Sequence, residues 1–225
     1  MKKLFATLFL LTCIPANLII IGWTGMTALA DDTPTFLPAP EISVNKATID
    51  RLQTYLSNLT TIISDFTQTA PDGTLSSGKF FLERPGRMRW QYNPPTPILM
   101  VSNGSELVYY DYELQQSSHI PLDQTLIGFL AQERIRFDTD TQVGITDLSI
   151  QPGVIRISLA QRDKPGDGQL MLEFSDRPLL LRNMVIRDAT HQVTTVSLNN
   201  ARFGVDIDPK LFDFREPGHR KIGRQ

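Results

Sequence analysis

The sequence predicts a mainly β domain of the α+β class, an antiparallel sheet of about eleven strands with helices on one side. Apolar and polar residues alternate over most of the chain after Thr60, which is the two-residue period of a strand. Turn motifs separate these runs, so successive strands are expected to form hairpins. One stretch before them has the three- and four-residue spacing of an amphipathic helix, and one short stretch among them is strongly apolar.

The first thirty residues have the three parts of a secretory signal peptide. Two lysines precede an apolar run that extends to about Leu29, and Ala28-Leu29-Ala30 forms a small-x-small site before Asp31. We therefore expect residues 1–30 to be a signal peptide, cleaved after Ala30, and the mature protein to reside in the periplasm. A retained anchor is the alternative, because the apolar run approaches the roughly 20 residues that span a bilayer.

Charge and cysteine content argue against two classes of function. Without the two lysines of residues 1–30, 20 basic residues stand against 24 acidic ones, and nucleic acid is not expected as a partner. The only cysteine, Cys13, lies in the segment to be removed, so neither a disulfide nor a thiol nucleophile is expected. The stability of the mature protein must come from packing. About 190 residues are enough to form the hydrophobic core of one domain.

A leader and a helix come before the strands. Residues 31–44 contain three prolines and no apolar period, which indicates a flexible leader. The helix that follows is expected to begin at Ser43 or Asn45 as its N-cap. One face of it must lie against something apolar, because five apolar residues recur at helical spacing: Ile49, Leu52, Tyr55, Leu56 and Leu59.

Five turn motifs divide the rest of the chain into strands. They are Asp72-Gly73, Asn93-Pro94-Pro95, Asn103-Gly104, Gln151-Pro152-Gly153 and Lys164-Pro165-Gly166-Asp167-Gly168. The clear interruption is a stretch from Leu122 to about Gln132. Four apolar residues there predict a short helix: Leu126, Ile127, Phe129 and Leu130.

Alternation shows which side chains share a face of the sheet. In the run from Gly86 to Tyr92, one side consists of Met88, Trp90 and Tyr92 and is predicted to be buried. The other side, with Arg87, Arg89 and Gln91, is predicted to lie in solvent. In the preceding run Phe80, Leu82 and Arg84 point inward together, which places a charge on an apolar face.

The later strands continue the apolar face with Ile155, Ile157 and Leu159, and then with Leu170, Leu172 and Phe174. Two helices are too little to cover a sheet of this length, so it has to curl around itself or around a ligand. Patterning alone leaves two interpretations open. The curled sheet and its helices enclose either a ligand cavity or a dry core.

Several short strings stand in a fixed order between Ile63 and Leu114, and one more lies near the end of the chain. They are Phe66-Thr67-Gln68, Ser77-Gly78-Lys79-Phe80, Arg84-Pro85-Gly86-Arg87-Met88-Arg89-Trp90, Val101-Ser102-Asn103-Gly104, Leu107-Val108-Tyr109-Tyr110-Asp111-Tyr112 and Asp208-Pro209-Lys210-Leu211-Phe212-Asp213-Phe214. In this order and spacing the chain resembles the LolA family, periplasmic carriers of outer-membrane lipoproteins. The family domain would then span residues 45–217, followed by a basic tail at 218–225.

The resemblance implies an incomplete antiparallel barrel with helices as a lid over an apolar cavity that receives the acyl chains of lipid-modified proteins. It implies two protein partners, an ABC-type lipoprotein exporter in the inner membrane and an acceptor at the outer membrane. A monomer without nucleotide, metal or other cofactor is expected. The chain departs from the family pattern in its proline-rich leader and in its short basic tail.

Arg84 aligns with the strand-end arginine of the family, which implies hydrogen bonds to the helical lid. A guanidinium has five donors and keeps its charge, so an inward arginine needs several acceptors. A rim arginine in a surface ion pair is the alternative. Met88 aligns with an apolar position beside the cavity mouth, or else simply packs beside Trp90. The remaining expected cavity residues are Phe80, Leu82 and Trp90 in the wall and Leu126, Ile127, Phe129 and Leu130 in the lid.

No residue set in the mature chain predicts catalysis. His119, His191 and His219 have no paired ligand spacing, so no metal site is expected. Ser105 lacks the flanking glycines of a nucleophile elbow. Within a non-enzymatic role, two alternatives to the lipoprotein carrier stay open: a lipid-sensing or accessory protein of the same fold, and a carrier of another lipid class.

Overall fold

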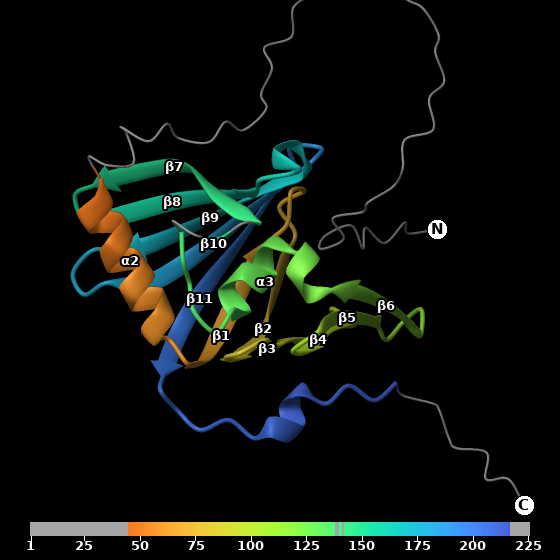
Figure 1. Ribbon diagram of the computed structural model, residues 1–225. Helices are drawn as coiled ribbons and strands as arrows, with labels where there is room; N and C mark the ends of the chain where they lie inside the picture. Colours follow the sequence, from red (N-terminus) through yellow and green to blue (C-terminus); the bar gives the residue numbers. More distant parts are fainter. Residues whose placement is uncertain (1–44, 138–139, 141, 217–225) are drawn as a thin grey trace, which may run out of the picture.

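The computed structural model describes residues 45–137, 140 and 142–216 (Figure 1). The predicted signal peptide at 1–30 with its cleavage site, the leader at 31–44 and the basic tail at 218–225 lie outside the described residues. Two α-helices and three 3-10 helices lie in the described part: α2 (Lys46–Asn58), α3 (Leu126–Ala131), η1 (Leu122–Gln124), η2 (Pro165–Asp167) and η3 (Pro209–Phe212). None of these helices has the length and apolar composition needed to cross a membrane.

Within the described residues, eleven strands form one antiparallel sheet, which confirms the predicted fold class. The order across the sheet is β6-β5-β4-β3-β2-β1-β11-β10-β9-β8-β7. The strands are β1 (Thr61–Thr69), β2 (Leu75–Glu83), β3 (Arg87–Tyr92), β4 (Ile98–Asn103), β5 (Glu106–Asp111), β6 (Gln116–Pro121), β7 (Val143–Gln151), β8 (Val154–Gln161), β9 (Gly168–Ser175), β10 (Leu180–Asp188) and β11 (Val193–Phe203).

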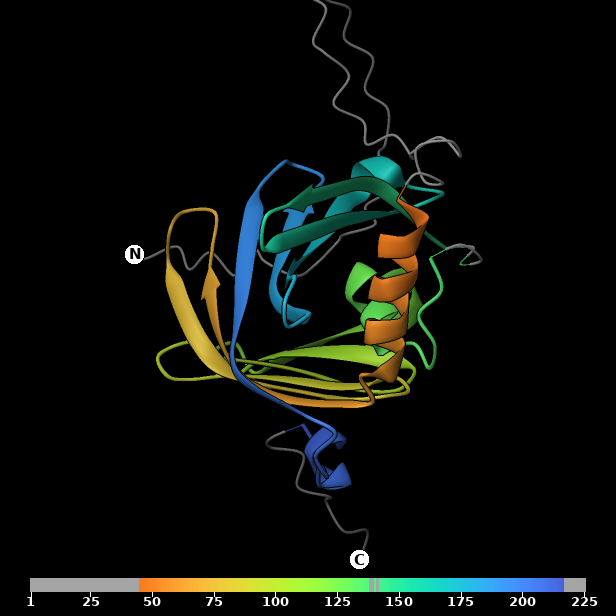
Figure 2. The same cartoon turned by 90° about the vertical axis from the view of Figure 1, so that its left-hand side faces the viewer.

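Sequential hairpins account for the whole order except the pairing of β1 with β11 in the middle. The two edge strands, β6 and β7, therefore follow each other in sequence. The segment between them contains η1 and α3 and passes from one edge of the sheet to the other. Figures 1 and 2 show the sheet curled into an incomplete barrel, with α3 inside the curl and α2 across its open side.

The pairing of β1 with β11 contains a β-bulge. Ile63 faces Arg202 and Asp65 faces Asn199, so β11 has one residue more than β1 in this interval. Asn200 in the bulge has φ +54°, a left-handed conformation that asparagine tolerates better than most residues. A bulge bends its strand and increases the local twist, which favours a curled sheet.

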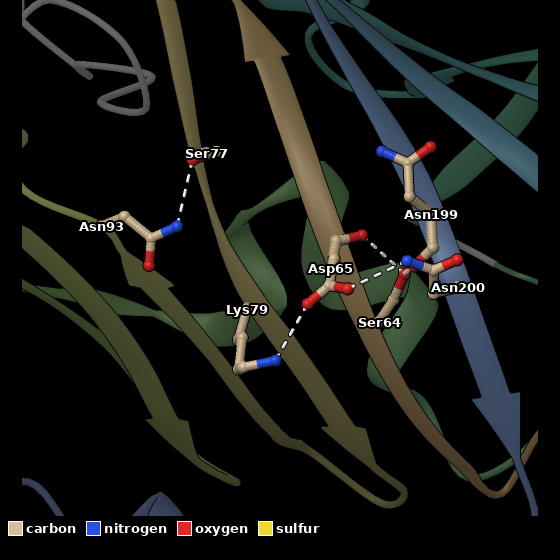
Figure 3. A network of polar contacts seen from close by, with 7 residues as sticks. All are labelled: Ser64, Asp65, Ser77, Lys79, Asn93, Asn199 and Asn200. Carbon is tan, nitrogen blue, oxygen red and sulfur yellow. Dashed lines mark hydrogen bonds and ion pairs between the residues drawn. The ribbon is translucent and has the colours of Figure 1, made fainter.

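Polar contacts fasten the same junction (Figure 3). The Ser64 hydroxyl donates to the carbonyl oxygen of Asn199 at 2.8 Å. Asp65 accepts from Lys79 Nζ at 2.9 Å and from Asn200 Nδ2 at 3.2 Å, and so connects β2 with β11 across β1. Both hydrogen bonds lower the pKa of Asp65 below its ordinary value, and the bond from Lys79 has the larger effect.

The two predicted helices form with small differences from the prediction. Asn45 is the N-cap of α2, whereas Ser43 lies outside the described residues, and the helix buries Ile49, Leu52 and Leu56. The short apolar helix is divided into η1 and α3. The division falls at Thr125, whose side chain accepts from Gly128 N and caps α3.

The predicted inner face of the sheet is buried throughout. Its members are each less than one-tenth exposed: Phe80, Leu82, Met88, Trp90, Tyr92, Ile155, Ile157, Leu159, Leu170, Leu172 and Phe174. They form one cluster with the apolar residues of both helices. The alternation of side chains therefore identified the face that encloses the interior.

The outer face of β3 differs from the prediction. Gln91 is exposed as expected, but Arg87 and Arg89 are half-buried beneath the segment around η3. Arg89 Nη1 donates to the carbonyl oxygen of Leu211 at 3.0 Å, and the Arg87 guanidinium lies over the buried Phe212 ring. The prediction that both arginines lie in solvent is wrong because a segment more than 100 residues away covers them.

Candidate functional site

Arg84 lies in the turn between β2 and β3 and points to the interior, as predicted. Its Nε donates to the carbonyl oxygen of Leu130 in α3 at 2.7 Å, and its Nη1 donates to the carbonyl oxygen of Leu56 in α2. One side chain from the sheet therefore connects both helices. Within the described residues no carboxylate forms an ion pair with Arg84, so the alternative of a surface ion pair is not what the structure shows.

The acceptors of Arg84 suit a cation. The last carbonyl groups of a helix lack intrahelical partners and carry the negative end of the helix dipole. Leu56 and Leu130 both belong to the last turns of their helices. Burial lowers the pKa of Arg84 to about 10, so the side chain remains charged at neutral pH. The contact therefore joins a cation to two helix C-termini.

Gly86 provides a second connection between this turn and α3. Its amide donates to the carbonyl oxygen of Ala131 at 2.7 Å, and its own carbonyl accepts from the buried Ser102 hydroxyl at 2.9 Å. Gly86 has φ +75°, and a Cβ here would lie 2.5 Å from the Cα of Gly104. Glycine is therefore required both by the backbone conformation and by the close approach of two turns.

The helix α2 is also joined to the segment that follows α3. Gln53 Oε1 accepts from Phe137 N at 3.0 Å, and the Ser57 hydroxyl donates to Ile135 O at 3.2 Å. Ile135 and Phe137 have their side chains buried. Local sequence patterns did not predict these contacts, although Gln53 and Ser57 stand four residues apart on one face of the helix. We call α2, α3 and residues 132–137 together the lid.

The opposite side of α2 is fixed to the far half of the sheet. Arg51 Nη1 forms an ion pair with Asp176 Oδ1 at 2.6 Å in the turn between β9 and β10. The Tyr55 hydroxyl accepts from Leu181 N at 3.0 Å, and its ring packs edge-on against Phe174. α2 therefore spans from the β9–β10 turn to the β2–β3 turn, across the open side of the curled sheet (Figure 2).

Aromatic rings dominate the wall beneath the lid. The Trp90 ring stacks on Phe80 with centroids 4.1 Å apart and meets Phe66 edge-on at 5.1 Å. Met88 and Leu82 adjoin them and are buried. All six residues of α3 are buried, and the predicted Leu126, Ile127, Phe129 and Leu130 belong to the same apolar cluster as this wall. The protein's own side chains thus occupy the space that the sheet encloses.

A cavity of about 650 Å³ lies beside α3 at the edge of the lid. The β2–β3 turn contributes Pro85 and Gly86, the β4–β5 turn contributes 103–105, and α3 contributes Phe129. Its lining is mixed, with Asp123 and Gln132 among the polar members. The cavity therefore borders the contacts that hold α3 in place.

The described residues contain no group of three histidine, cysteine, aspartate or glutamate side chains suited to a metal ion. His119 Nδ1 lies 3.0 Å from Glu106 Oε2 across the exposed β5–β6 pair. Asp208 caps η3 by accepting from Lys210 N at 3.0 Å. These polar groups have structural partners outside the interior.

Curled β-sheets with an apolar interior are one of the architectures that can enclose hydrophobic ligands. The family model of the outer membrane lipoprotein carrier protein LolA matches residues 57–215, and the chain belongs to this family. The predicted family is thereby confirmed.

Relatives with the same description cover most of the chain. The outer-membrane lipoprotein carrier protein of Methylococcus capsulatus is 31% identical over 176 residues, which are 74% of this chain and 83% of the relative. That of Nitrosomonas europaea is 27% identical over 80% of this chain and 89% of the relative. A solved LolA superfamily protein from Nitrosomonas europaea aligns with 73% of this chain and 97% of its own, at a TM-score of 0.40 and 12% identity.

Proposed function

We propose that this protein is a periplasmic carrier that binds the acyl chains of lipoproteins released from the inner membrane and delivers them to the outer membrane. The observation that carries the proposal is the way the apolar interior is closed. Beyond its apolar packing, α3 is joined to the sheet turn through hydrogen bonds from Arg84 and Gly86. Because these contacts are non-covalent, α3 can leave the interior and return to it.

The energetics of acyl burial support a lid of this kind. Each buried methylene contributes about 0.8 kcal/mol, so full enclosure of the acyl chains opposes their delivery. In the closed state the apolar side chains of α3 occupy the interior. Cargo has to displace them, and the free energy of lid closure offsets part of the binding free energy.

We assign the predicted cavity residues to two parts of the carrier. Arg84 holds the lid closed and is released, or takes a cargo group as acceptor, when the lid opens. Met88 contributes a flexible apolar side chain to the wall. The other wall residues are Phe80, Leu82 and Trp90, and the lid residues that cargo displaces are Leu126, Ile127, Phe129 and Leu130.

The proposed location in the periplasm places the carrier between the inner and the outer membrane. Cleavage after Ala30 would give a monomeric shuttle, starting at Asp31, that crosses between the membranes. An ABC-type exporter in the inner membrane would load it, and an acceptor at the outer membrane would unload it. The carrier needs no catalysis and no cofactor, because binding and release are both driven by exchange of apolar contacts.

Release of lipoprotein from spheroplasts tests the proposal. The chain from Asp31 is added to spheroplasts, recovered by affinity, and its ligand is identified by mass spectrometry. Triacylated lipoprotein in the complex is the expected result. A Met88→Glu variant, with a charge in the wall, should recover none, whereas Leu75→Glu at an exposed position should behave as the parent. Free lipid would indicate a carrier of another lipid class, and neither ligand would point to a sensor or accessory protein.

A further inference from the structure

Two hydrogen-bond donors on the inner face of the sheet have no partner among the described residues. They are the indole Nε1 of Trp90 and the hydroxyl of Tyr109, and both atoms are buried. Trp90 as a whole is 2% exposed. A neighbouring buried phenol is satisfied, since the Tyr92 hydroxyl donates to Gln68 Oε1 at 2.7 Å. Buried donors normally find an acceptor, so two unsatisfied ones in the same interior need an explanation.

Both donors belong to one row across the sheet. Trp90 in β3 is paired with Met100 in β4, which is paired with Tyr109 in β5. Directly paired residues project to the same face, and adjacent strands are roughly 4.8 Å apart, so the two Cα atoms are about 10 Å apart. Met100 between them is 1% exposed, and Tyr109, which is half-buried, packs against the same apolar cluster. The two donors therefore lie on the same inner face of the sheet, within one apolar cluster.

The surroundings decide which acceptor fits. The Trp90 ring lies between Phe80 and Phe66, so a charged or strongly hydrated ligand would lose its solvation here without compensation. The indole only donates, and burial raises the pKa of Tyr109 to about 12, so its hydroxyl keeps its proton at neutral pH. The fitting ligand is a neutral acceptor carried on a hydrocarbon chain. An acyl ester carbonyl has this chemistry.

We propose that Trp90 and Tyr109 form a polar subsite within the apolar interior that binds the ester carbonyl oxygens of the acyl chains. This inference rests on the proposed carrier function and specifies how its cargo is oriented. An apolar wall alone does not fix how deeply a hydrocarbon chain enters, because the hydrophobic effect is not directional. Two donors at fixed positions would set how deeply the acyl chains enter and where the glycerol backbone lies.

Two lipopeptides distinguish binding at the polar subsite from binding by the apolar wall. One carries two ester-linked C16 chains on a glyceryl-cysteine peptide, and the other carries ether-linked chains of the same length, which lack the carbonyl oxygens. Their dissociation constants are measured for the chain from Asp31 and for Trp90→Phe and Tyr109→Phe. We expect the parent to prefer the ester by about fivefold to tenfold, and each variant to lose much of that preference while its affinity for the ether stays the same.

Tyr109→Phe removes only a hydroxyl, so it tests the subsite even if Trp90→Phe disturbs the packing. Tyr112→Phe, at an exposed position, is the matched control and should keep the preference of the parent. As an independent readout, the indole N–H resonance of Trp90 should move downfield with the ester lipopeptide and not with the ether.

Equal affinity of the parent for ester and ether, with no change of the indole resonance, would overturn the subsite and leave the carrier function intact. It would mean that the donors are satisfied by water or remain unpaired. Failure of the parent to bind either lipopeptide would overturn the carrier function, and the subsite with it.

Discussion

The Arg84 guanidinium lies between two helices that are more than 60 residues apart in sequence, 2.7 Å from the carbonyl oxygen of Leu130 and hydrogen-bonded to that of Leu56. Because both acceptors belong to helix ends, their partial negative charge favours this cation. Opening the lid leaves the arginine with fewer acceptors and both carbonyls with fewer donors. Arg84 is therefore one of the contacts that opening has to break, beside the Gly86 amide and the apolar packing of α3.

Replacing Arg84 by leucine should slow the release of cargo. Hydrogen bonds to a charged group contribute about 1.5–3 kcal/mol each, so closure weakens and cargo competes with a weaker lid. We expect transfer of a bound lipopeptide to an acceptor to slow by at least about tenfold, with a smaller effect on the thermal midpoint. Arg87→Leu is the matched control, since Arg87 bonds to Glu83 on the outer face. Equal transfer by Arg84→Leu and the parent would remove Arg84 from the site.

Gly86→Ala should destabilise the protein more than Gly73→Ala. Both glycines have positive φ, +75° and +81°, so both variants strain the backbone. Only at Gly86 would the new Cβ meet another backbone, that of Gly104, whereas Gly73 has nothing within 4 Å. Overpacking of this kind costs about 1–3 kcal/mol, to be measured as the difference in free energy of unfolding in urea. Equal losses would show that the two turns move apart and accommodate the new Cβ.

Gln53→Ala should loosen the segment after α3 without unfolding α2. The variant leaves Phe137 N without its acceptor, and an unpaired buried amide costs about 1–3 kcal/mol. Hydrogen exchange in residues 132–137 should accelerate by about fivefold or more, while the sheet amides keep their rates. Thr54→Ala on the exposed side of the helix is the control and should leave the exchange unchanged. Uniform acceleration over the whole chain would instead indicate global destabilisation.

Tyr109 gives the fold a dependence on alkaline pH. Burial first, and then the charge of Asp111, raises the pKa of Tyr109 to about 12, whereas an unfolded tyrosine titrates near about 10. Its contribution to the free energy of unfolding is therefore complete below about pH 10 and is lost as the pH rises toward 12. In urea unfolding between about pH 9 and 11.5, Tyr109→Phe should lose less stability than the parent. Parallel curves would mean that the phenol is solvated.

Local patterns predicted most of the sheet, because strand alternation and turn chemistry act over a few residues. The inward positions of Trp90 and Arg84 followed from parity alone. Parity fails where a bulge inserts a residue, as at Arg182 between Leu181 and Asn183 in β10. Such a shift depends on pairing with the neighbouring strand, which no local pattern contains.

The contacts between distant segments were not predictable in the same way. The cover over Arg89 comes from Leu211, and the acceptor for Phe137 N comes from Gln53, each pair separated by more than 80 residues. In the sequence, Arg89 and Gln53 look like ordinary polar residues of the surface. Only the folded chain shows that they hold segments to the sheet and to α2.

The order of the strands has a mechanical consequence. The segment that contains η1 and α3 leaves one edge strand, β6, and enters the other, β7, so its two ends are anchored at opposite rims of the incomplete barrel. The position of α3 is therefore constrained at both ends by the two edge strands. A partner bound at either edge would act on the segment that closes the interior without entering the interior itself.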